Sequence, residues 1–281
     1  MKQQVPPHLT IKSARRMKSL LLGNFKAVFS GKGLEFQDFR AYTYGDDARY
    51  IDWATSTREG TTLIRRYQEE KDAPILCIVD MTTSLDFIDG ELKQKCMSEV
   101  IKLLWHVSLG SGESFGGYKL YQENHIYIPA RKTPLSLAEL EKKYSQNLRD
   151  IHQSLDIWFL LKKPLKRSII FILSDSMNLD MRSFKIAALK HDIIFVSLAS
   201  HFENTLEWKG IYRMQGKKDG FALDLDDLWK KQRYQEHRKE QQKSFQNELR
   251  KNKIDCIFLD ETSSIVSNFL SLMYAREHKK N

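Results

Sequence analysis

The stretch ILCIVDMTTSLDF (Ile75–Phe87) begins with an unbroken apolar run and then changes to an acid followed by hydroxyls. An apolar run of this length is typical of a strand that is buried on both faces of a sheet. Asp80, Thr82, Thr83 and Ser84 therefore come where such a strand ends. The stretch predicts a buried strand over Pro74–Asp80 whose last residue reaches the edge of a sheet.

The same alternation of apolar strands and helices continues along the chain. Further strands are predicted at Ser114–Pro129 (two strands and a turn), Arg167–Ser176, Asp192–Ser200 and Lys253–Asp260. Helices are predicted at Glu91–Gly110, Met181–His191, Asp226–Lys251 and Ser264–Tyr274, with helical segments in Leu135–Leu161. This order predicts an α/β fold, a doubly wound, mostly parallel sheet flanked by helices.

The first part of the chain has a different pattern. Residues 1–70 are expected to form a separate N-terminal segment, with an amphipathic helix at Ile11–Phe29 and an arm that contains a strand at Thr62–Gln68. Residues 71–281 are expected to form the α/β domain. With 281 residues and 41% hydrophobic composition, the chain is long enough for one such domain with an appendage.

Composition also narrows the class of protein. The three cysteines lie in apolar surroundings without metal-ligand or disulfide spacing, which indicates a reducing compartment. The longest apolar run near the start, Leu20–Leu22, is far too short for a signal peptide or a membrane span. We therefore expect a soluble, cytoplasmic protein without a transmembrane segment.

The formal charge of +9 is unevenly distributed. Residues 1–32 hold seven Lys and Arg and no acid, and residues 229–253 hold nine Lys and Arg against three Glu. Such segments can face an acidic partner protein or a membrane surface, so peripheral membrane contact stays open. The chain lacks a nucleic-acid-binding signature, which disfavours nucleic acid as a partner.

Two predicted strands end in an acid. Asp80 and Asp175 both follow strands of the predicted parallel sheet, and ligands of such sheets bind at the carboxyl ends of the strands. Thr82 and Ser84 add hydroxyls at fixed spacing after Asp80. Hard oxygen ligands of this kind suit Mg²⁺ or Mn²⁺, so the sequence predicts one metal site that includes both acids.

These residues resemble a known adhesion motif. The segment VDMTTS is similar to the metal-ion-dependent adhesion site of von Willebrand factor A domains, whose first motif is Asp-x-Ser-x-Ser after the first core strand. Asp80, Thr82 and Ser84 match it with Thr in place of the first Ser, and Asp175 resembles the later Asp. The resemblance implies a further Thr ligand from an intermediate loop, for which Thr133 is the candidate.

The arm resembles the signature of the bacterial family called domain of unknown function 58. Its segment GLEFQDFRAYTYGDDARYIDW, followed by a basic strand, is similar to the family pattern Gly-x-Glu-Phe, Arg-x-Tyr, Gly-Asp-Asp, Arg-x-Ile-Asp-Trp. The signature residues of this arm include Arg40, Gly45, Asp46, Asp47, Arg49, Asp52, Trp53 and Arg58. Proteins of this family often accompany MoxR-type AAA+ ATPases in the assembly or maturation of other proteins, which implies such an ATPase as a partner.

The charges of the arm have a structural interpretation as well. Asp46, Asp47 and Asp52 lie near Arg40, Arg49 and Arg58 in the sequence, and bidentate Arg–carboxylate pairs can lock an irregular segment. A rigid clasp and a binding surface are both compatible with this composition.

The hypothesis that combines these features is a non-enzymatic, metal-dependent binding module. Asp80, Thr82, Ser84 and Asp175 would hold Mg²⁺, and an acidic side chain of a partner protein would complete its coordination shell.

Two alternatives remain open from the sequence. One is a haloacid-dehalogenase-like, Mg²⁺-dependent phosphohydrolase with Asp80 as nucleophile, Ser174 as phosphate-binding hydroxyl and the acids of Leu223–Asp227 at the metal. The other is a metal-free scaffold in which the basic segments bind the partner.

Overall fold

A computed structural model of the protein describes residues 34–69, 73–80, 90–121, 124–133, 135–144, 154–207, 209–215 and 220–280. The described chain divides into two compact units, with the division between residues 73 and 74. The first unit is an arm of two strands and short helices, and the second is an α/β unit. The helix predicted at residues 11–29 lies outside the described residues.

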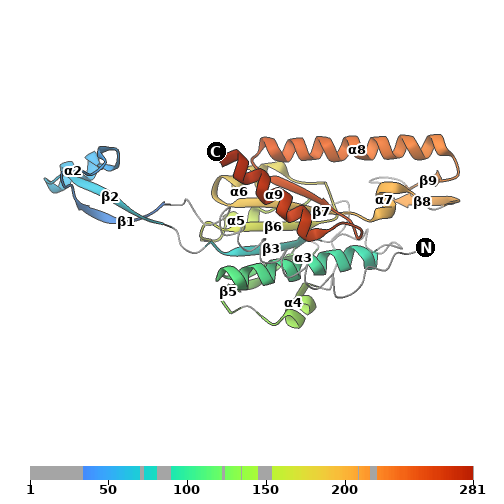
Figure 1. The fold of residues 1–281 in the computed structure, drawn as a ribbon, viewed down its shortest axis with the longest axis horizontal. Coiled ribbons are helices and arrows are strands. Elements are labelled where there is room, and N and C mark those ends of the chain that lie inside the picture. The colour runs from blue at the N-terminus through green and yellow to red at the C-terminus, as the bar shows by residue number, and fades with distance from the viewer. Residues whose placement is uncertain are drawn as a thin grey trace. The chain divides into compact units, whose positions relative to one another are not determined.

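The α/β unit is built on a six-stranded sheet in the order β10-β7-β6-β3-β4-β5 (Figure 1). Its strands are β3 (Ile75–Asp80), β4 (Phe115–Tyr121), β5 (Asn124–Arg131), β6 (Ile169–Ser174), β7 (Asp192–Leu198) and β10 (Asp255–Leu259). All neighbours are parallel except β4 and β5, which form an antiparallel pair at one edge. The predicted α/β class with a mostly parallel, helix-flanked sheet is therefore confirmed.

The helices cover both faces of this sheet, as expected when strands are apolar on both sides. They are α3 (Gly90–Ser111), α4 (Leu137–Tyr144), α5 (Trp158–Leu161), α6 (Met181–Lys190), α7 (His201–Thr205), α8 (Leu228–Lys251) and α9 (Ile265–Lys280). On one face, Phe269 of α9 stacks on Phe171 of β6, and α3 packs beside α9. The other face carries α5, α6 and α8, whose buried residues join one core cluster with the strands.

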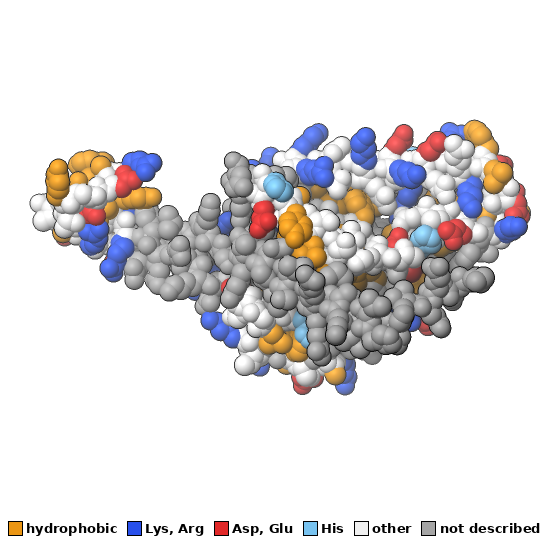
Figure 2. All heavy atoms as spheres, in the orientation of Figure 1, with side chains coloured by type: hydrophobic (Ala, Val, Ile, Leu, Met, Phe, Trp, Pro, Cys, Tyr) orange, Lys and Arg blue, Asp and Glu red, His pale blue; other side chains and the backbone are white. Residues whose placement is uncertain are grey.

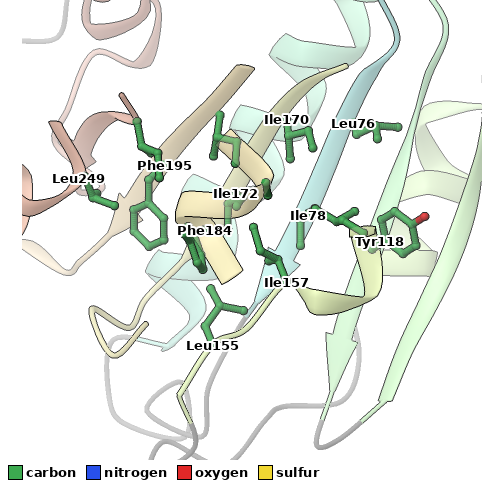
Figure 3. Close-up of a cluster of buried hydrophobic side chains, with 14 of the residues drawn as sticks. Leu76, Ile78, Tyr118, Leu155, Ile157, Ile170, Ile172, Phe184, Phe195 and Leu249 are labelled. Carbon is green, nitrogen blue, oxygen red and sulfur yellow. The ribbon is translucent and has the colours of Figure 1, made fainter. Parts of the chain in front are cut away.

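This core cluster explains the order of the elements on the second face. Ile78, Ile172 and Phe195 point from successive strands into the layer formed by α5, α6 and α8 (Figure 3). Phe184 of α6 is fully buried there, and Leu249 joins the cluster from α8. Burying a large apolar side chain contributes about 1.5–3 kcal/mol, so this layer is a main source of stability for the unit.

The remaining part of the α/β unit extends from the end of β7. A hairpin of β8 (Ile211–Gln215) and β9 (Gly220–Asp224) forms a separate two-stranded sheet. Leu206 and Leu225 form a small second core there, against which Phe202 and Tyr234 pack. The first half of α8 therefore packs on this small core, whereas its second half packs on the main sheet through Phe245 and Leu249.

The arm consists of the antiparallel strands β1 (Leu34–Ala41) and β2 (Leu63–Glu69), the short 3₁₀ helix η1 (Ala48–Tyr50) and helix α2 (Trp53–Glu59). Among the arm side chains that the structure describes, those of residues 38–66, Ile64 is the one buried apolar residue. An isolated two-stranded hairpin is marginal in water, so the polar contacts of the arm contribute to its order.

Some elements of the structure were not predicted from the sequence, and one predicted helix ends at a different residue. β1 was not predicted because the residues from Gly31 onward are polar and aromatic, and β8 and α7 were not predicted either. The last helix extends to Lys280, beyond its predicted end at Tyr274. None of the helices within the described ranges is both long and apolar enough to cross a membrane.

A buried histidine lies where α6 joins β7. His191 is 4% exposed, and neither of its ring nitrogens has a hydrogen-bond partner among the described residues. Burial, together with the nearby cations Lys190 and Arg167, lowers the pKa of His191 to about 4. The imidazole of His191 is therefore neutral in the folded protein at neutral pH.

We expect this histidine to make the protein sensitive to acid. In the unfolded chain an imidazole takes up a proton below about pH 6.5, whereas His191 in the folded chain stays neutral down to about pH 4. The unfolded state therefore binds more protons in this window, and at pH 5 the free energy of unfolding should fall by about 2 kcal/mol through this residue.

Urea unfolding of the wild type and of His191→Met between pH 7 and pH 5 measures this contribution, and the variant should lack it. His237→Met, on the exposed side of α8, is the control and should keep the wild-type pH dependence. An equal loss of stability with pH in wild type and His191→Met would contradict the prediction.

Candidate functional site

The candidate site lies where the strand order of the sheet reverses. The chain leaves β3 to form β4 and β5 on one side, and β6, β7 and β10 follow on the other side. This is the order of doubly wound folds that bind ligands in the crevice outside the carboxyl ends of the two central strands. Here those strands are β3 and β6, which pair in parallel with Asp80 opposite Ser174.

Asp80 is held at this point by a buried hydrogen bond. The Ser174 hydroxyl donates to Asp80 Oδ2 at 2.8 Å, and both residues are fully buried. The same hydroxyl accepts a hydrogen bond from the Ser176 backbone N–H at 3.0 Å. Burying a carboxylate costs free energy unless it is paired, hydrogen-bonded or bound to a metal ion. Asp80 therefore differs from the solvent-exposed acids that are common in turns after strands.

Asp175 follows Ser174 directly and is partly buried. Because β3 and β6 are adjacent and parallel, the two predicted acids belong to one edge of the sheet. The structure thus brings Asp80 and Asp175 to neighbouring strand ends, as the sequence predicted. The other two predicted ligands, Thr82 and Ser84, lie outside the described residues.

Thr133 does not belong to this site, which corrects the sequence-based prediction. It follows β5, which runs antiparallel to β4, so that Arg131 pairs with Phe115 at the start of β4. Asp80 pairs with Leu120 near the end of β4. Thr133 is therefore at the opposite edge of the sheet, about 20 Å away along the strands, and its side chain is exposed.

Ser174 makes a contact that the sequence did not indicate. Its hydroxyl was weighed only as a phosphate-binding group, whereas the structure shows it bound to the candidate metal ligand Asp80. The signal was the hydroxyl directly before the strand-end acid in FILSDS. A residue that orients a metal ligand in this way can affect metal affinity 10- to 100-fold in general.

An ion-pair network lies beside the same group of strand ends. Lys93 of α3 is 3% exposed and pairs with Glu203 of α7, which also accepts a hydrogen bond from Arg238 of α8 at 2.9 Å. Helix α7 follows the end of β7, and Ser200 caps it. The network therefore ties three helices together, and nothing in the sequence around Lys93 indicated that this lysine is buried.

The acids that the phosphohydrolase alternative would need have other partners. Asp227 caps α8 by accepting hydrogen bonds from the backbone N–H groups of Trp229 and Lys230. Asp224 accepts a hydrogen bond from the Asp226 backbone N–H in the turn before α8. Throughout the described ranges, His, Cys, Asp and Glu side chains do not gather in groups of three or more that could hold a metal.

In the arm, two of the signature acids pair with the arginines that the sequence suggested. Asp46 binds both terminal nitrogens of Arg40, at 2.7 and 2.9 Å, and also the Thr43 backbone N–H, and these contacts hold the pKa of the Asp46 carboxyl far below its usual value. Asp47 binds Arg49 and caps the helix η1. Gly45, with φ of +103°, makes the turn between these pairs.

The third signature acid has a different partner from the one expected. Asp52 binds Arg65 of β2, with 2.7 Å from Nε to the carboxylate, and does not pair with Arg58. It caps α2 through the Thr55 backbone N–H, and this bond and Arg65 lower its pKa. The hydroxyl of Ser56 links the backbones of Asp52 and Leu63, so this corner fastens α2 to β2.

The remaining signature side chains of the arm are exposed. Trp53 is 68% exposed and Arg58 is also exposed, and Tyr44 and Tyr50 add further aromatic surface. Figure 2 shows this gathering of hydrophobic side chains on the arm. The arm is therefore both a clasp of ion pairs and a surface with several exposed aromatic rings.

Comparisons with known proteins point to one family. The model of the family described as "Protein of unknown function DUF58" matches residues 38–245. The uncharacterized proteins Rv1480 of Mycobacterium tuberculosis and Mb1516 of Mycobacterium bovis are each 23% identical over 228 residues, which cover 77% of this chain and 70% of theirs. No solved structure matches the chain. The matched region includes most of the arm and the strands that form the candidate site, and the chain belongs to the DUF58 family.

Proposed function

We propose that this protein is a non-enzymatic binding module of the von Willebrand factor A-like type, which captures a partner protein through a bound divalent metal ion. Asp80 and Asp175, together with Thr82 and Ser84, would hold Mg²⁺ or Mn²⁺. An acidic side chain of the partner would complete the coordination shell of the ion.

The observation that carries the proposal is the position of Asp80. A fully buried carboxylate ends the central strand at the switch point of the sheet, where the Ser174 hydroxyl donates a hydrogen bond to its Oδ2. A second acid, Asp175, comes at the end of the adjacent strand. Carboxylate and hydroxyl oxygens are the donors that Mg²⁺ and Mn²⁺ prefer, so the residues present fit such an ion.

The resemblance of the arm to the family signature also supports an interaction with a second protein. We propose a MoxR-type AAA+ ATPase as the partner with which the protein acts in the assembly or maturation of other proteins. The exposed aromatic rings of the arm, among them Trp53 and Tyr44, offer a contact surface of the kind enriched in protein interfaces.

Titration calorimetry with Mg²⁺ and Mn²⁺ on the full chain tests the metal site. The wild type should bind one ion, Asp80→Asn should bind none, and the exposed-site control Asp226→Asn should bind as the wild type does. Capture of a MoxR-type AAA+ ATPase from the same organism should then be lost with EDTA and with Asp80→Asn. Absence of metal binding by the folded wild type would replace this proposal by the metal-free scaffold.

The stability of Asp80→Asn without metal gives an independent prediction. The amide keeps an oxygen that can accept the Ser174 hydroxyl but removes a fully buried negative charge. We therefore expect the metal-free variant to be more stable than the metal-free wild type, by roughly 1 kcal/mol, as at functional sites that are costly for the fold. Thermal unfolding in EDTA measures this difference, and a clear loss of stability would mean that Asp80 serves the fold instead.

A phosphatase assay on the same proteins separates the enzymatic alternative. Mg²⁺-dependent hydrolysis of an aryl phosphate that disappears with Asp80→Asn would favour the phosphohydrolase. The proposal expects that the wild type hydrolyses no more aryl phosphate than Asp80→Asn does.

A further inference from the structure

Helix α6 carries an unusual combination of side chains on its outer face. Its inner face is buried through Phe184 and Ala187. The outer face repeats at helical spacing, and all its members are exposed: Arg182, Lys185, Ile186, Leu189 and Lys190. Cations and aliphatic side chains thus alternate on one exposed stripe.

Helix α5 and the connection that follows it to β6 lie beside this stripe. The Trp158 indole N–H donates to the carboxylate of Asp180, the residue that caps α6, at 2.8 Å. At the other end of the helix, Lys190 and Arg167 both act on the pKa of His191. The stripe and the connection therefore form one surface, which we call the basic–apolar patch and define as the exposed residues of 157–168 and 181–190.

The patch is strongly positive. Its two segments hold seven Lys and Arg residues and no Asp or Glu, with Asp156 and Asp180 at their borders. One cation, Lys163, lies over the rings of Tyr118 and Tyr127. The others form no ion pair with any residue that the structure describes; these are Lys162, Lys166, Arg167, Arg182, Lys185 and Lys190.

Helix α8, which contains most of the basic segment 229–253, differs from this patch in its distribution of charge. Its cations are interspersed with Glu236, Glu240 and Glu248, and Figure 2 shows both signs of charge along the helix. Such mixing is typical of a solvated helix face. The basic–apolar patch lacks these acids, which concentrates its positive potential.

The apolar members of the patch indicate the kind of surface that it meets. Leu189 is 83% exposed, Ile186 44% and Trp158 38%. Phosphate groups of nucleic acid gain nothing from aliphatic side chains, whereas a lipid bilayer offers anionic headgroups directly above an apolar layer. Lys and Arg together with Trp, Leu or Ile are the composition of surfaces that lie in the bilayer interface.

We propose that the basic–apolar patch docks the protein on an anionic lipid bilayer. The cations contact the lipid phosphates, and Leu189, Ile186 and Trp158 enter the headgroup region. The patch extends along α6 from Arg182, which follows the carboxyl end of β6, to Lys190, which precedes the start of β7. The inference does not depend on the proposed function.

Vesicle sedimentation of the full chain tests the proposal. We expect binding to phosphatidylcholine vesicles that contain about one third phosphatidylglycerol, and weak binding to pure phosphatidylcholine, at about 0.15 M ionic strength. Each cation near such a surface contributes about fivefold to the partition coefficient. The triple variant Arg182→Gln, Lys185→Gln, Lys190→Gln should therefore bind on the order of a hundredfold more weakly.

A matched control removes three exposed cations from the opposite face of the sheet. Lys95→Gln, Lys142→Gln, Lys143→Gln on α3 and α4 has the same net charge as the triple variant and should bind nearly as the wild type does. Leu189→Ser keeps every charge and should lose about tenfold in binding, by a factor that does not change with salt. Circular dichroism shows that each variant is folded.

Four outcomes would overturn the proposal. They are no binding to the anionic vesicles, an equal loss in the control and the triple variant, no effect of Leu189→Ser, and tighter binding of a DNA duplex with the same dependence on the three α6 cations. The last result would identify the patch as a nucleic-acid surface.

Discussion

Gly117→Ala is expected to unfold the α/β unit. In β4, a Cβ atom on Gly117 would lie 1.8 Å from the carbonyl oxygen of Cys77 in β3, and its neighbouring contacts are also backbone atoms. No side chain can move to make room, so β3 and β4 would have to separate. We expect a loss of more than about 4 kcal/mol, a large part of the 5–15 kcal/mol that stabilises a typical domain.

Urea unfolding followed by circular dichroism, together with the yield of soluble protein, measures this effect. Gly112→Ala is the matched control, because Gly112 has a φ of +78° but nothing within 4 Å of the added methyl group. It should cost only about 1–2 kcal/mol, the cost of the left-handed conformation for alanine. A Gly117→Ala protein as stable as Gly112→Ala would show that the strands are not as closely spaced as described.

Arg276→Met is the second substitution with a large expected effect. Arg276 of α9 binds Asp192 at 2.9 Å through both terminal nitrogens and Asp255 at 2.6 Å through Nε, and its side chain is 12% exposed. These carboxylates stand at the starts of β7 and β10. Removing the cation leaves two partly buried acids side by side, which should cost about 3–5 kcal/mol.

Two further variants test whether the loss of stability comes from the two acids that are left without the arginine. Lys102→Met breaks an exposed pair with Glu99 and should change the free energy of unfolding by no more than about 0.5 kcal/mol. The triple variant Arg276→Met, Asp192→Asn, Asp255→Asn should regain a substantial part of the stability lost by Arg276→Met alone. If neutralising the two acids restores nothing, the loss comes from packing of the arginine side chain.

The strands of the main sheet could be predicted closely because local sequence decides them. The apolar runs that end at Asp80 and at Ser174 are buried at every position, and their length and β-branched residues are typical of buried strands. By contrast, the hairpin partner β1 of the arm was missed, because its strand is defined by pairing with β2 and not by an apolar pattern.

The candidate site shows the same division. Asp80 and Asp175 could be placed together because parallel strands carry their carboxyl ends to one edge. The predicted position of Thr133 was wrong because the residues of β5 do not determine the direction in which this strand runs in the sheet. Likewise, Asp52 has two arginines within reach along the chain, and only the register of the arm selects Arg65 over Arg58.

The sequence by itself determined the α/β class, the strands and helices of the main sheet, and the two acids at adjacent strand ends, because each depends on short-range pattern and on the geometry of parallel strands. Only the tertiary structure decided that Ser174 binds Asp80, that Thr133 is at the far edge, and that the cations of α6 and of the connection between α5 and β6 form one surface. These depend on strand direction and on helix packing, which bring together residues that are distant in the chain. The strand ILCIVD therefore places Asp80 at the candidate site, and the neighbouring strands of the sheet determine which residues lie beside it.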